Sequence, residues 1–163
     1  MNKAVFFDRD GVINYERGEY TYKLKDFIFN NEVIKNIHRL YSNGFIIIII
    51  SNQGGIAKGI YTKNDVEKLN KYINEAFKKN NIELKEIYYC PHHSDIENCL
   101  CRKPDSLLLE KAITKYNIEP SASYFIGDSE RDIISAKKAG INPIKIIPNE
   151  NITKYCNLIL KKL

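Results

Sequence analysis

Short apolar runs alternate along the chain with segments whose apolar residues recur every three or four positions. The runs at 4–7 and 45–50 are continuous, which is typical of strands buried on both faces of a parallel sheet. Three further runs predict strands at 87–89, 124–126 and 144–147. The alternation predicts an α/β fold, with a mainly parallel sheet and helices on both of its faces.

The segments between these runs carry the periodicity of helices that are apolar on one face. Four of them are predicted to be helical: 32–43, 62–77, 108–116 and 132–139. Thr62, with Asp65 three residues later, is typical of a helix N-cap, and Gly44 and Gly140 stand where two helices should end. The tail 152–163 fits a strand and a helix equally well.

Length and composition predict one domain over residues 1–163, since the chain has the usual size of a compact domain and 44% hydrophobic residues. The apolar run near the N-terminus is too short for a signal peptide, and the longest run, 45–50, is too short to span a membrane. We therefore expect a cytoplasmic protein with no membrane partner. We also expect a monomer.

The net charge of +5 comes from 25 basic and 20 acidic residues. A solvated, lysine-rich surface accounts for it most simply, and attraction of an anionic substrate or a nucleic acid is the alternative. The lysines are spread along the chain without a dense basic run. Charge alone therefore gives little support to nucleic-acid binding.

Acidic residues follow the first and fourth predicted strands, at the edge of a parallel sheet where chemistry usually gathers. Asp8 and Asp10 come after the first strand, and Asp128 after the fourth. Three carboxylates on one rim would repel one another, and Mg²⁺ would resolve the repulsion. The alternative is that these residues are turn residues and helix N-caps, which fits Asp128 better than the Asp8–Asp10 pair.

The same rim has the groups that phosphoryl transfer requires. One carboxylate can attack phosphorus, and a second carboxyl can protonate the leaving oxygen and then activate water. Ser51 offers a hydroxyl, the backbone of Asn52, Gln53 and Gly54 offers N–H donors, and Lys103 offers a positive charge.

Four motifs in order along the chain resemble those of the haloacid dehalogenase superfamily of phosphatases: Asp8-Arg9-Asp10-Gly11-Val12, Ser51-Asn52-Gln53, Arg102-Lys103-Pro104, and Gly127-Asp128 through Asp132. The resemblance implies a capless, Rossmann-like domain in which Asp8 is the nucleophile and Asp10 the general acid and base. It implies Mg²⁺ on Asp8, on the Asp10 backbone carbonyl and on Asp128. Ser51 and Lys103 would hold the transferring phosphate, and Asp132 would orient Lys103.

The loop 90–103 gathers three of the four cysteines and two of the three histidines. Cys90 with His92 and Cys99 with Cys101 form two short hooks, and three thiolates with one imidazole make a closed tetrahedral zinc set of the structural kind. A disulfide is disfavoured in a reducing compartment, and nothing else in the sequence argues for redox reactivity. The zinc loop resembles the branch that holds D-glycero-D-manno-heptose 1,7-bisphosphate phosphatases and histidinol-phosphate phosphatases.

This resemblance favours a small phosphorylated metabolite as the substrate. The leading expectation is hydrolysis of the 7-phosphate of the heptose bisphosphate, through an aspartyl-phosphate, on the route to nucleotide-activated heptose. Histidinol phosphate is the alternative substrate, and a zinc-containing nucleic-acid binding module is the alternative from another class. Residues Asn14, Glu16 and Arg17 could contact the substrate, and Arg102 could bind a second phosphate. Ser129 stands where relatives often carry a basic residue.

Overall fold

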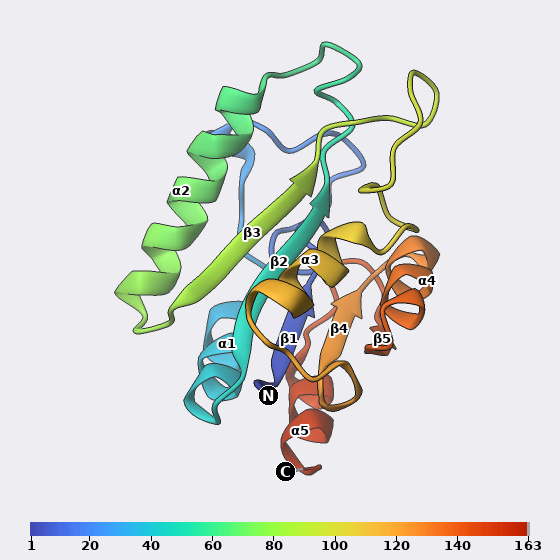
Figure 1. Cartoon of the computed structure of the whole chain (residues 1–163). Helices are drawn as coiled ribbons and strands as arrows, with labels where there is room; N and C mark the ends of the chain where they lie inside the picture. Colours follow the sequence, from blue (N-terminus) through green and yellow to red (C-terminus); the bar gives the residue numbers. More distant parts are fainter. Residues whose placement is uncertain (163) are drawn as a thin grey trace.

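Five parallel strands form one sheet in this computed structural model, which describes residues 1–162. Their order across the sheet is β3-β2-β1-β4-β5, and every neighbouring pair is parallel. The strands are β1 (Ala4–Phe7), β2 (Ile46–Asn52), β3 (Leu84–Cys90), β4 (Tyr124–Gly127) and β5 (Asn142–Lys145). Their carboxyl ends point to one edge, so the loops that follow them gather there (Figure 1).

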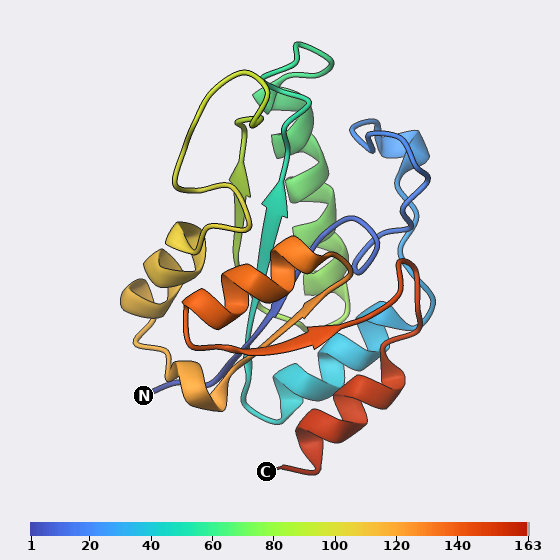
Figure 2. The same cartoon turned by 90° about the vertical axis from the view of Figure 1, so that its right-hand side faces the viewer.

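Helices cover both faces of this sheet, as the alternating pattern predicted. The helices are α1 (Val33–Ser42), α2 (Lys63–Lys79), α3 (Leu107–Lys115), α4 (Glu130–Lys138) and α5 (Thr153–Leu160), with two short 3-10 turns, η1 (Leu24–Asp26) and η2 (Pro120–Ala122). The core cluster on one face takes its helical residues from α1, α2 and α5, and the cluster on the other face takes them from α3 and α4. Figure 2 shows α3 on one side of the sheet and α1 and α5 on the other side.

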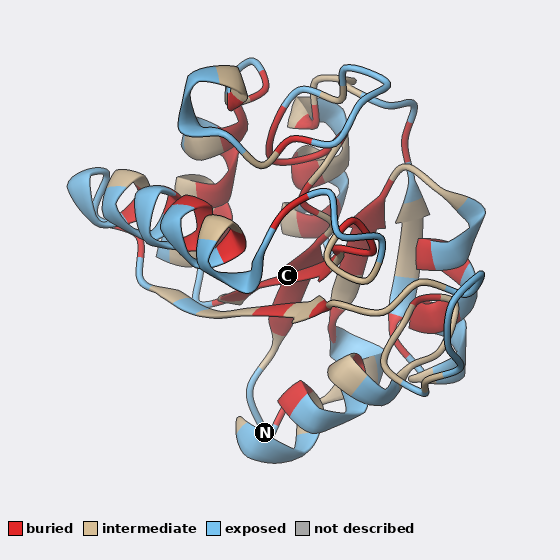
Figure 3. Ribbon diagram, turned by 90° about the horizontal axis from the view of Figure 1, so that it is seen from above, coloured by how far each residue is buried: buried red, intermediate tan, exposed pale blue. Residues whose placement is uncertain are grey.

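Alternate residues of the strands supply these two clusters. On β1, Val5 and Phe7 belong to the first cluster, whereas Ala4 and Phe6 belong to the second. All four side chains are completely buried, which explains why the strand reads as a continuous apolar run rather than an alternating one. Figure 3 shows the buried strands between helices whose outer faces are exposed.

Side chains fix the beginnings of two helices. Thr62 and Asp65 form the predicted cap of α2, in which Asp65 N donates to Thr62 Oγ1 at 3.2 Å and Thr62 N donates to Asp65 Oδ2 at 2.9 Å. Ser129 and Asp132 form the same reciprocal arrangement at the start of α4. The second cap matters for the site described below, because it orients Asp132.

The structure corrects the starts of two predicted strands and decides the tail. The strand β3 begins at Leu84, three residues before the predicted start, because Leu84 already pairs with Ile47 of β2. The last strand begins at Asn142, two residues before the predicted start, because β5 pairs with β4 along its whole length, from Tyr124 opposite Asn142 to Gly127 opposite Lys145. The tail, which fitted a strand and a helix equally, contains the helix α5. Its Cys156 and Ile159 are buried in the first core cluster. Within residues 1–162, no helix is both long and apolar enough to cross a membrane.

Candidate active site

Two neighbouring strands bring the acids Asp8 and Asp128 together. Asp8 follows β1 and Asp128 follows β4, and the backbone N–H of Asp8 extends the pairing of these strands by donating to Ile126 O at 3.0 Å. Gly11 makes the close approach possible: its φ is +82°, and a Cβ atom there would lie 1.9 Å from Asp128 Oδ2. Any other residue at position 11 would displace Asp128.

An acid cluster of Asp8, Asp128 and Asp132 is the centre of the site. Each offers a carboxylate oxygen, and these oxygens lie within 4.8 Å of one another. Burial raises the pKa of Asp8 to about 8, with Asp132 adding to the rise and Lys103 offsetting part of it. Burial and Asp132 likewise raise the pKa of Asp128 to about 6. At Asp132, burial is outweighed by Lys103 and Ser129, which instead lower the pKa of this carboxyl group. Asp8 and Asp128, two oxygen donors that resist carrying their charges together, fit a hard divalent cation such as Mg²⁺.

Lys103 is the cation of this cluster. Its Nζ lies 2.8 Å from Asp8 Oδ1 and 2.7 Å from Asp132 Oδ1, and it donates to Ile50 O at 2.9 Å. The side chain is 3% exposed; burial works against its charge, but Asp8 and Asp132 raise the pKa of Lys103 and keep it protonated. One ammonium among three carboxylates still leaves an excess of negative charge.

The backbone of Lys103 is held from the end of β2. Asn52 Nδ2 donates to Lys103 O at 3.0 Å, and Lys103 N donates to Asn52 Oδ1 at 3.0 Å. Asn52 was predicted to contribute a backbone donor to the phosphate. Its side chain has this second task, which no motif in the sequence indicated.

Asp132 is fully buried and divides its two oxygens between two tasks. Oδ2 accepts from the backbone N–H of Ser129 at 3.0 Å and from Ser129 Oγ at 2.7 Å, whereas Oδ1 faces Lys103. Gly127 leaves room for it, since a Cβ atom there would lie 2.3 Å from Asp132 Cβ. The cap of α4 thereby aims a carboxylate oxygen at the lysine.

Asp10 lies in a different environment from Asp8, although only one residue separates them. Arg9 Nη2 lies 2.8 Å from Asp10 Oδ1 and 2.9 Å from Oδ2, Asn14 Nδ2 donates to Oδ1 at 3.0 Å, and Gln53 Nε2 donates to Oδ2 at 3.2 Å. Arg9 is 1% exposed, so its charge is committed to this contact. Two carboxyl groups with such distinct surroundings can take two distinct chemical roles.

A cavity of about 650 Å³ opens over these groups, within the usual range for small-molecule sites. Most of the residues predicted for catalysis and substrate binding line it: Asp8, Asp10, Glu16, Asn52, Gln53, Gly54, Arg102, Lys103, Asp128 and Asp132. Glu19 and Tyr20, from the loop that also contains Glu16, line it as well, together with residues that no prediction from the sequence assigned to substrate binding: Arg9, His93, Ser129 and Arg131.

Three predicted residues do not line the cavity. Asn14 is fully buried and donates to Asp10. Ser51 is 1% exposed, and its Oγ accepts from Gln53 Nε2 at 2.6 Å. Arg17 pairs with Asp26 at 3.1 Å, because the turn η1 brings that acid back toward it. Asn14 and Arg17 therefore act on other side chains of this structure rather than facing the cavity.

Arg102 and Arg131 supply positive charge to the cavity lining. Arg102 Nη1 donates to His92 O at 2.9 Å, and neither arginine has a carboxylate within 4.0 Å among residues 1–162. The ring of His93 lies close to Gly54, where a Cβ atom would be 2.7 Å from His93 Cδ2. Burial together with the cations Lys58, Arg102 and Arg131 lowers the pKa of His93.

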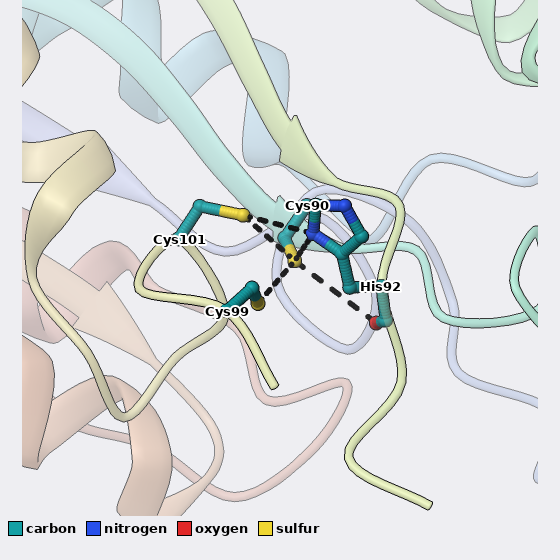
Figure 4. Close-up of side chains that lie close together, drawn as sticks. All are labelled: Cys90, His92, Cys99 and Cys101. Carbon is teal, nitrogen blue, oxygen red and sulfur yellow. Dashed lines mark hydrogen bonds between the residues drawn. The ribbon is translucent and has the colours of Figure 1, made fainter. Parts of the chain in front are cut away.

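A sulfur cluster of Cys90, His92, Cys99 and Cys101 lies just before Arg102 (Figure 4). Cys90 Sγ is 3.6 Å from Cys99 Sγ and 3.2 Å from Cys101 Sγ, and His92 Nδ1 is 3.5 Å from Cys90 Sγ and 3.2 Å from Cys101 Sγ. All the cysteines are free. Ligand atoms of tetrahedral zinc lie about 3.5–3.8 Å apart, given the usual zinc–sulfur and zinc–nitrogen distances; two of these separations fall in that range, and the two that involve Cys101, at 3.2 Å, are shorter. The four predicted ligands thus fit a zinc ion.

Comparison with known proteins gives one family. The model of the polynucleotide kinase 3 phosphatase family matches residues 3–143. The D-glycero-β-D-manno-heptose-1,7-bisphosphate 7-phosphatase of Pasteurella multocida is 32% identical over all of this chain and 94% of that protein. The D-glycero-α-D-manno-heptose-1,7-bisphosphate 7-phosphatase of Campylobacter jejuni is 36% identical over 91% of this chain and 84% of that protein. A D,D-heptose 1,7-bisphosphate phosphatase from B. bronchiseptica, solved with magnesium and phosphate, has the same fold: the TM-score is 0.91 at 22% identity, over 99% of both chains.

Proposed function

The chain belongs to the polynucleotide kinase 3 phosphatase family of haloacid dehalogenase-like phosphatases, and from this premise we propose that it hydrolyses the 7-phosphate of a D-glycero-D-manno-heptose 1,7-bisphosphate. The observation that carries the proposal is Asp8 beside Lys103, within an acid cluster that lines the cavity. The substrate comes from the relatives, whose names specify this bisphosphate.

Asp8 is the nucleophile. Its Oδ1 accepts from the backbone N–H of Arg9 at 2.7 Å and from Lys103 Nζ at 2.8 Å. Oδ2 accepts no hydrogen bond from residues 1–162, so it is the oxygen we assign to the attack. Oδ2 forms a bond to phosphorus while the bond from phosphorus to the sugar oxygen breaks, which yields an aspartyl-phosphate and an alcohol.

Asp10 moves the protons. It protonates the sugar oxygen as that oxygen leaves, and it then removes a proton from the water that attacks the aspartyl-phosphate. Phosphate departs and the Asp8 carboxylate is restored. The contacts with Arg9, Asn14 and Gln53 fix the orientation of the Asp10 carboxyl group through both steps.

Charge neutralisation falls to Lys103 and to a metal. Asp8, the Asp10 backbone carbonyl and Asp128 would hold Mg²⁺, which when bound neutralises charge on the phosphoryl oxygens. Lys103 meets the same oxygens from the side of Asp132, with help from Ser51 and from the backbone N–H of Gly54; the backbone N–H of Gln53 is not available, because it donates to Cys90 O. Cys90, His92, Cys99 and Cys101 would hold a structural zinc that shapes the loop 90–103.

Arg102 and Arg131 are the groups we assign to the second phosphate. Neither is paired with a carboxylate among residues 1–162, and both line the cavity. Arg131 comes two residues after Ser129, so it can make up for the basic residue that is missing there. The planar guanidinium group of an arginine can donate two parallel hydrogen bonds to a phosphate, which the ammonium group of a lysine cannot do.

Histidinol phosphate is the second candidate, because Glu16 and Glu19 line the same cavity. Their carboxylates fit the ammonium of that substrate, and they fit the hydroxyls of a sugar as well. The bisphosphate is preferred because it gives the two unpaired arginines a partner.

A side-by-side assay with Mg²⁺ tests the choice. We expect kcat/KM for the heptose bisphosphate to exceed that for histidinol phosphate at least ~100-fold, a difference of about 2.7 kcal/mol. Both anomers belong in the assay, because the relatives carry both names. Arg102→Ala and Arg131→Ala should each narrow the gap, whereas Lys137→Ala, an exposed residue of α4, should leave it unchanged. Equal or reversed preference would overturn the substrate assignment.

The remaining parts of the proposal concern the protein's surroundings. We assign it to nucleotide-heptose synthesis in the cytoplasm, where its free thiols would stay reduced. We take it to act as one domain over 1–163 and as a monomer, since one chain supplies every residue of the site. We expect no nucleic-acid partner, and a 3′-phosphorylated oligonucleotide in the same assay tests that expectation.

A further inference from the structure

We propose that Tyr61 is a positioning residue for the general acid Asp10, and that it acts by fixing the orientation of the Gln53 side-chain amide. The inference rests on the proposed phosphatase chemistry. Tyr61 does not line the cavity, so its effect on the reaction has to pass through another residue.

Three hydrogen bonds connect Tyr61 to the site. Tyr61 Oη donates to Gln53 Oε1 at 2.8 Å, and Gln53 Nε2 donates to Asp10 Oδ2 at 3.2 Å and to Ser51 Oγ at 2.6 Å. Tyr61 is 5% exposed and Gln53 is 1% exposed. Burial raises the pKa of Tyr61 to about 12, so the hydroxyl retains its proton and remains a donor.

The position of Tyr61 is built into the structure. Its ring lies against the backbone of Gly55, where a Cβ atom would be 2.1 Å from Tyr61 Cε1. On another side it stacks on Tyr22, with ring centroids 5.1 Å apart and planes inclined by 13°. Tyr20, which lines the cavity, meets the same ring edge-on at 5.6 Å. The ring is held from two loops, so the hydroxyl has one direction in which to donate.

The hydroxyl determines which end of the amide faces Asp10. With Tyr61 donating to Oε1, the NH₂ group of Gln53 is directed to Asp10 and Ser51. Without the hydroxyl, Oε1 is a buried acceptor with no donor, which is costly. Half a turn of the amide relieves this cost, because Ser51 Oγ can then donate to Oε1. Asp10 Oδ2 would lose a donor and face an oxygen, so its carboxyl group would turn away from the leaving oxygen.

The consequence depends on how much the leaving oxygen needs a proton. A strongly basic leaving group relies on general acid catalysis, whereas a weakly basic phenolate departs with little help. A misaligned Asp10 therefore slows the transfer of phosphate from a basic leaving group more than from an acidic one. A merely structural defect would slow both alike.

The test compares two aryl phosphates of similar size on the Mg²⁺-loaded Tyr61→Phe enzyme. We expect kcat/KM to fall roughly tenfold for phenyl phosphate and less than about threefold for 4-nitrophenyl phosphate, in line with the loss of one hydrogen bond. Tyr22→Phe is the matched control, since it removes a hydroxyl from the stacked partner ring without touching Gln53. It should leave both values within about twofold of those of the unmodified enzyme.

A double variant tests whether the effect passes through Gln53. Tyr61→Phe should add nothing to the phenyl phosphate defect of Gln53→Ala, since residues that act as a unit are not additive. Both rates come from one preparation, so unfolded protein lowers them equally and leaves their ratio unchanged. An unchanged ratio in Tyr61→Phe, or additive effects in the double variant, would overturn the inference. An unmodified enzyme inactive toward all phosphates would instead overturn the proposed function.

Discussion

The acid cluster (Asp8, Asp128, Asp132) and the sulfur cluster (Cys90, His92, Cys99, Cys101) are two ligand sets built on different supports. Two strand ends and the first turn of a helix hold the carboxylates, and the two strands, β1 and β4, pair with each other. Only Cys90 of the sulfur cluster belongs to a strand; its other three residues lie in the loop 91–103.

Lys103 connects the two clusters. It follows Cys101 by two residues, and its ammonium enters the acid cluster from the side of Asp132. The backbone N–H of Gln53 donates to Cys90 O at 2.8 Å, which ties the start of the loop to the phosphate-binding turn. In the proposed mechanism, the acid cluster therefore carries the chemistry, and the sulfur cluster determines where the loop places Arg102 and Lys103.

Asp8→Asn should give the largest effect, because it removes the chemistry of the acid cluster while leaving the sulfur cluster and the fold intact. It removes the attacking oxygen at nearly constant volume, so we expect turnover of at most about 10⁻⁴ of the unmodified enzyme. The midpoint of thermal unfolding should not fall, because burial disfavours the charge of this carboxylate. Phosphate release and a melting curve on one preparation check both. Near-normal turnover with Mg²⁺ would rule out the covalent route.

Asp10→Asn should cost both rate and stability, unlike Asp8→Asn. We expect kcat to fall roughly 10²–10⁴-fold, the usual worth of general acid–base catalysis. Arg9 is almost fully buried and loses its carboxylate partner, so the free energy of unfolding should fall by about 1–3 kcal/mol. Steady-state rates and urea unfolding measure the two effects. If stability is unchanged, the contact with Arg9 does not matter to the fold.

Cys101→Ser should show the opposite pattern to Asp8→Asn. The unmodified protein should contain about one zinc per chain, and the variant much less. We expect the free energy of unfolding to fall by more than about 2 kcal/mol. KM should rise about tenfold as Arg102 and Lys103 lose their support, while kcat should stay within about threefold. Metal analysis, melting curves and steady-state kinetics measure these changes.

Cys156→Ala is the matched control for the zinc prediction. This fourth cysteine is fully buried in the core and is not part of the sulfur cluster. The control should keep its zinc and its KM. A zinc-free protein, purified without chelator and fully active, would refute the structural role of the metal.

The framework of the molecule could be predicted from its sequence, because it depends on patterns within single segments. Continuous apolar runs identified the parallel strands, and the rule that strand ends meet at one edge brought Asp8 and Asp128 together. The four sulfur-cluster residues were equally predictable, since they stand in two short hooks. The displaced start of β5 and the helix α5 were not, because pairing with β4 and packing in the core decided them.

Contacts between distant side chains escaped prediction for a physical reason. Nothing in the sequence shows that Arg9 turns inward to hold Asp10 or that Tyr61 reaches Gln53, since each contact depends on how two loops fold over each other. Arg17 shows the opposite error. It was predicted to contact the substrate because it stands near the catalytic turn in the sequence, but its side chain pairs with Asp26. Proximity along a loop is therefore a poor guide to which side chains face the cavity.

The pH dependence of Mg²⁺ stabilisation should give the smallest effect, and it probes the acid cluster without a mutation. The raised pKa values, about 8 for Asp8 and about 6 for Asp128, mean that the folded protein holds protons that the unfolded chain releases near pH 4. The stability of the metal-free protein should therefore fall as pH rises from about 4 to about 8. Mg²⁺ replaces those protons when it binds. At a concentration about ten times its Kd at pH 8, Mg²⁺ should raise the melting temperature by roughly 3–5 °C at pH 8. The same concentration should raise it by much less at pH 5, where the protons compete with the metal. Asp128→Asn should make the metal-free profile less steep between pH 4 and 6, where only the contribution of Asp8 would remain. A Mg²⁺ effect that is equal at both pH values would show that the metal binds without displacing protons from this cluster.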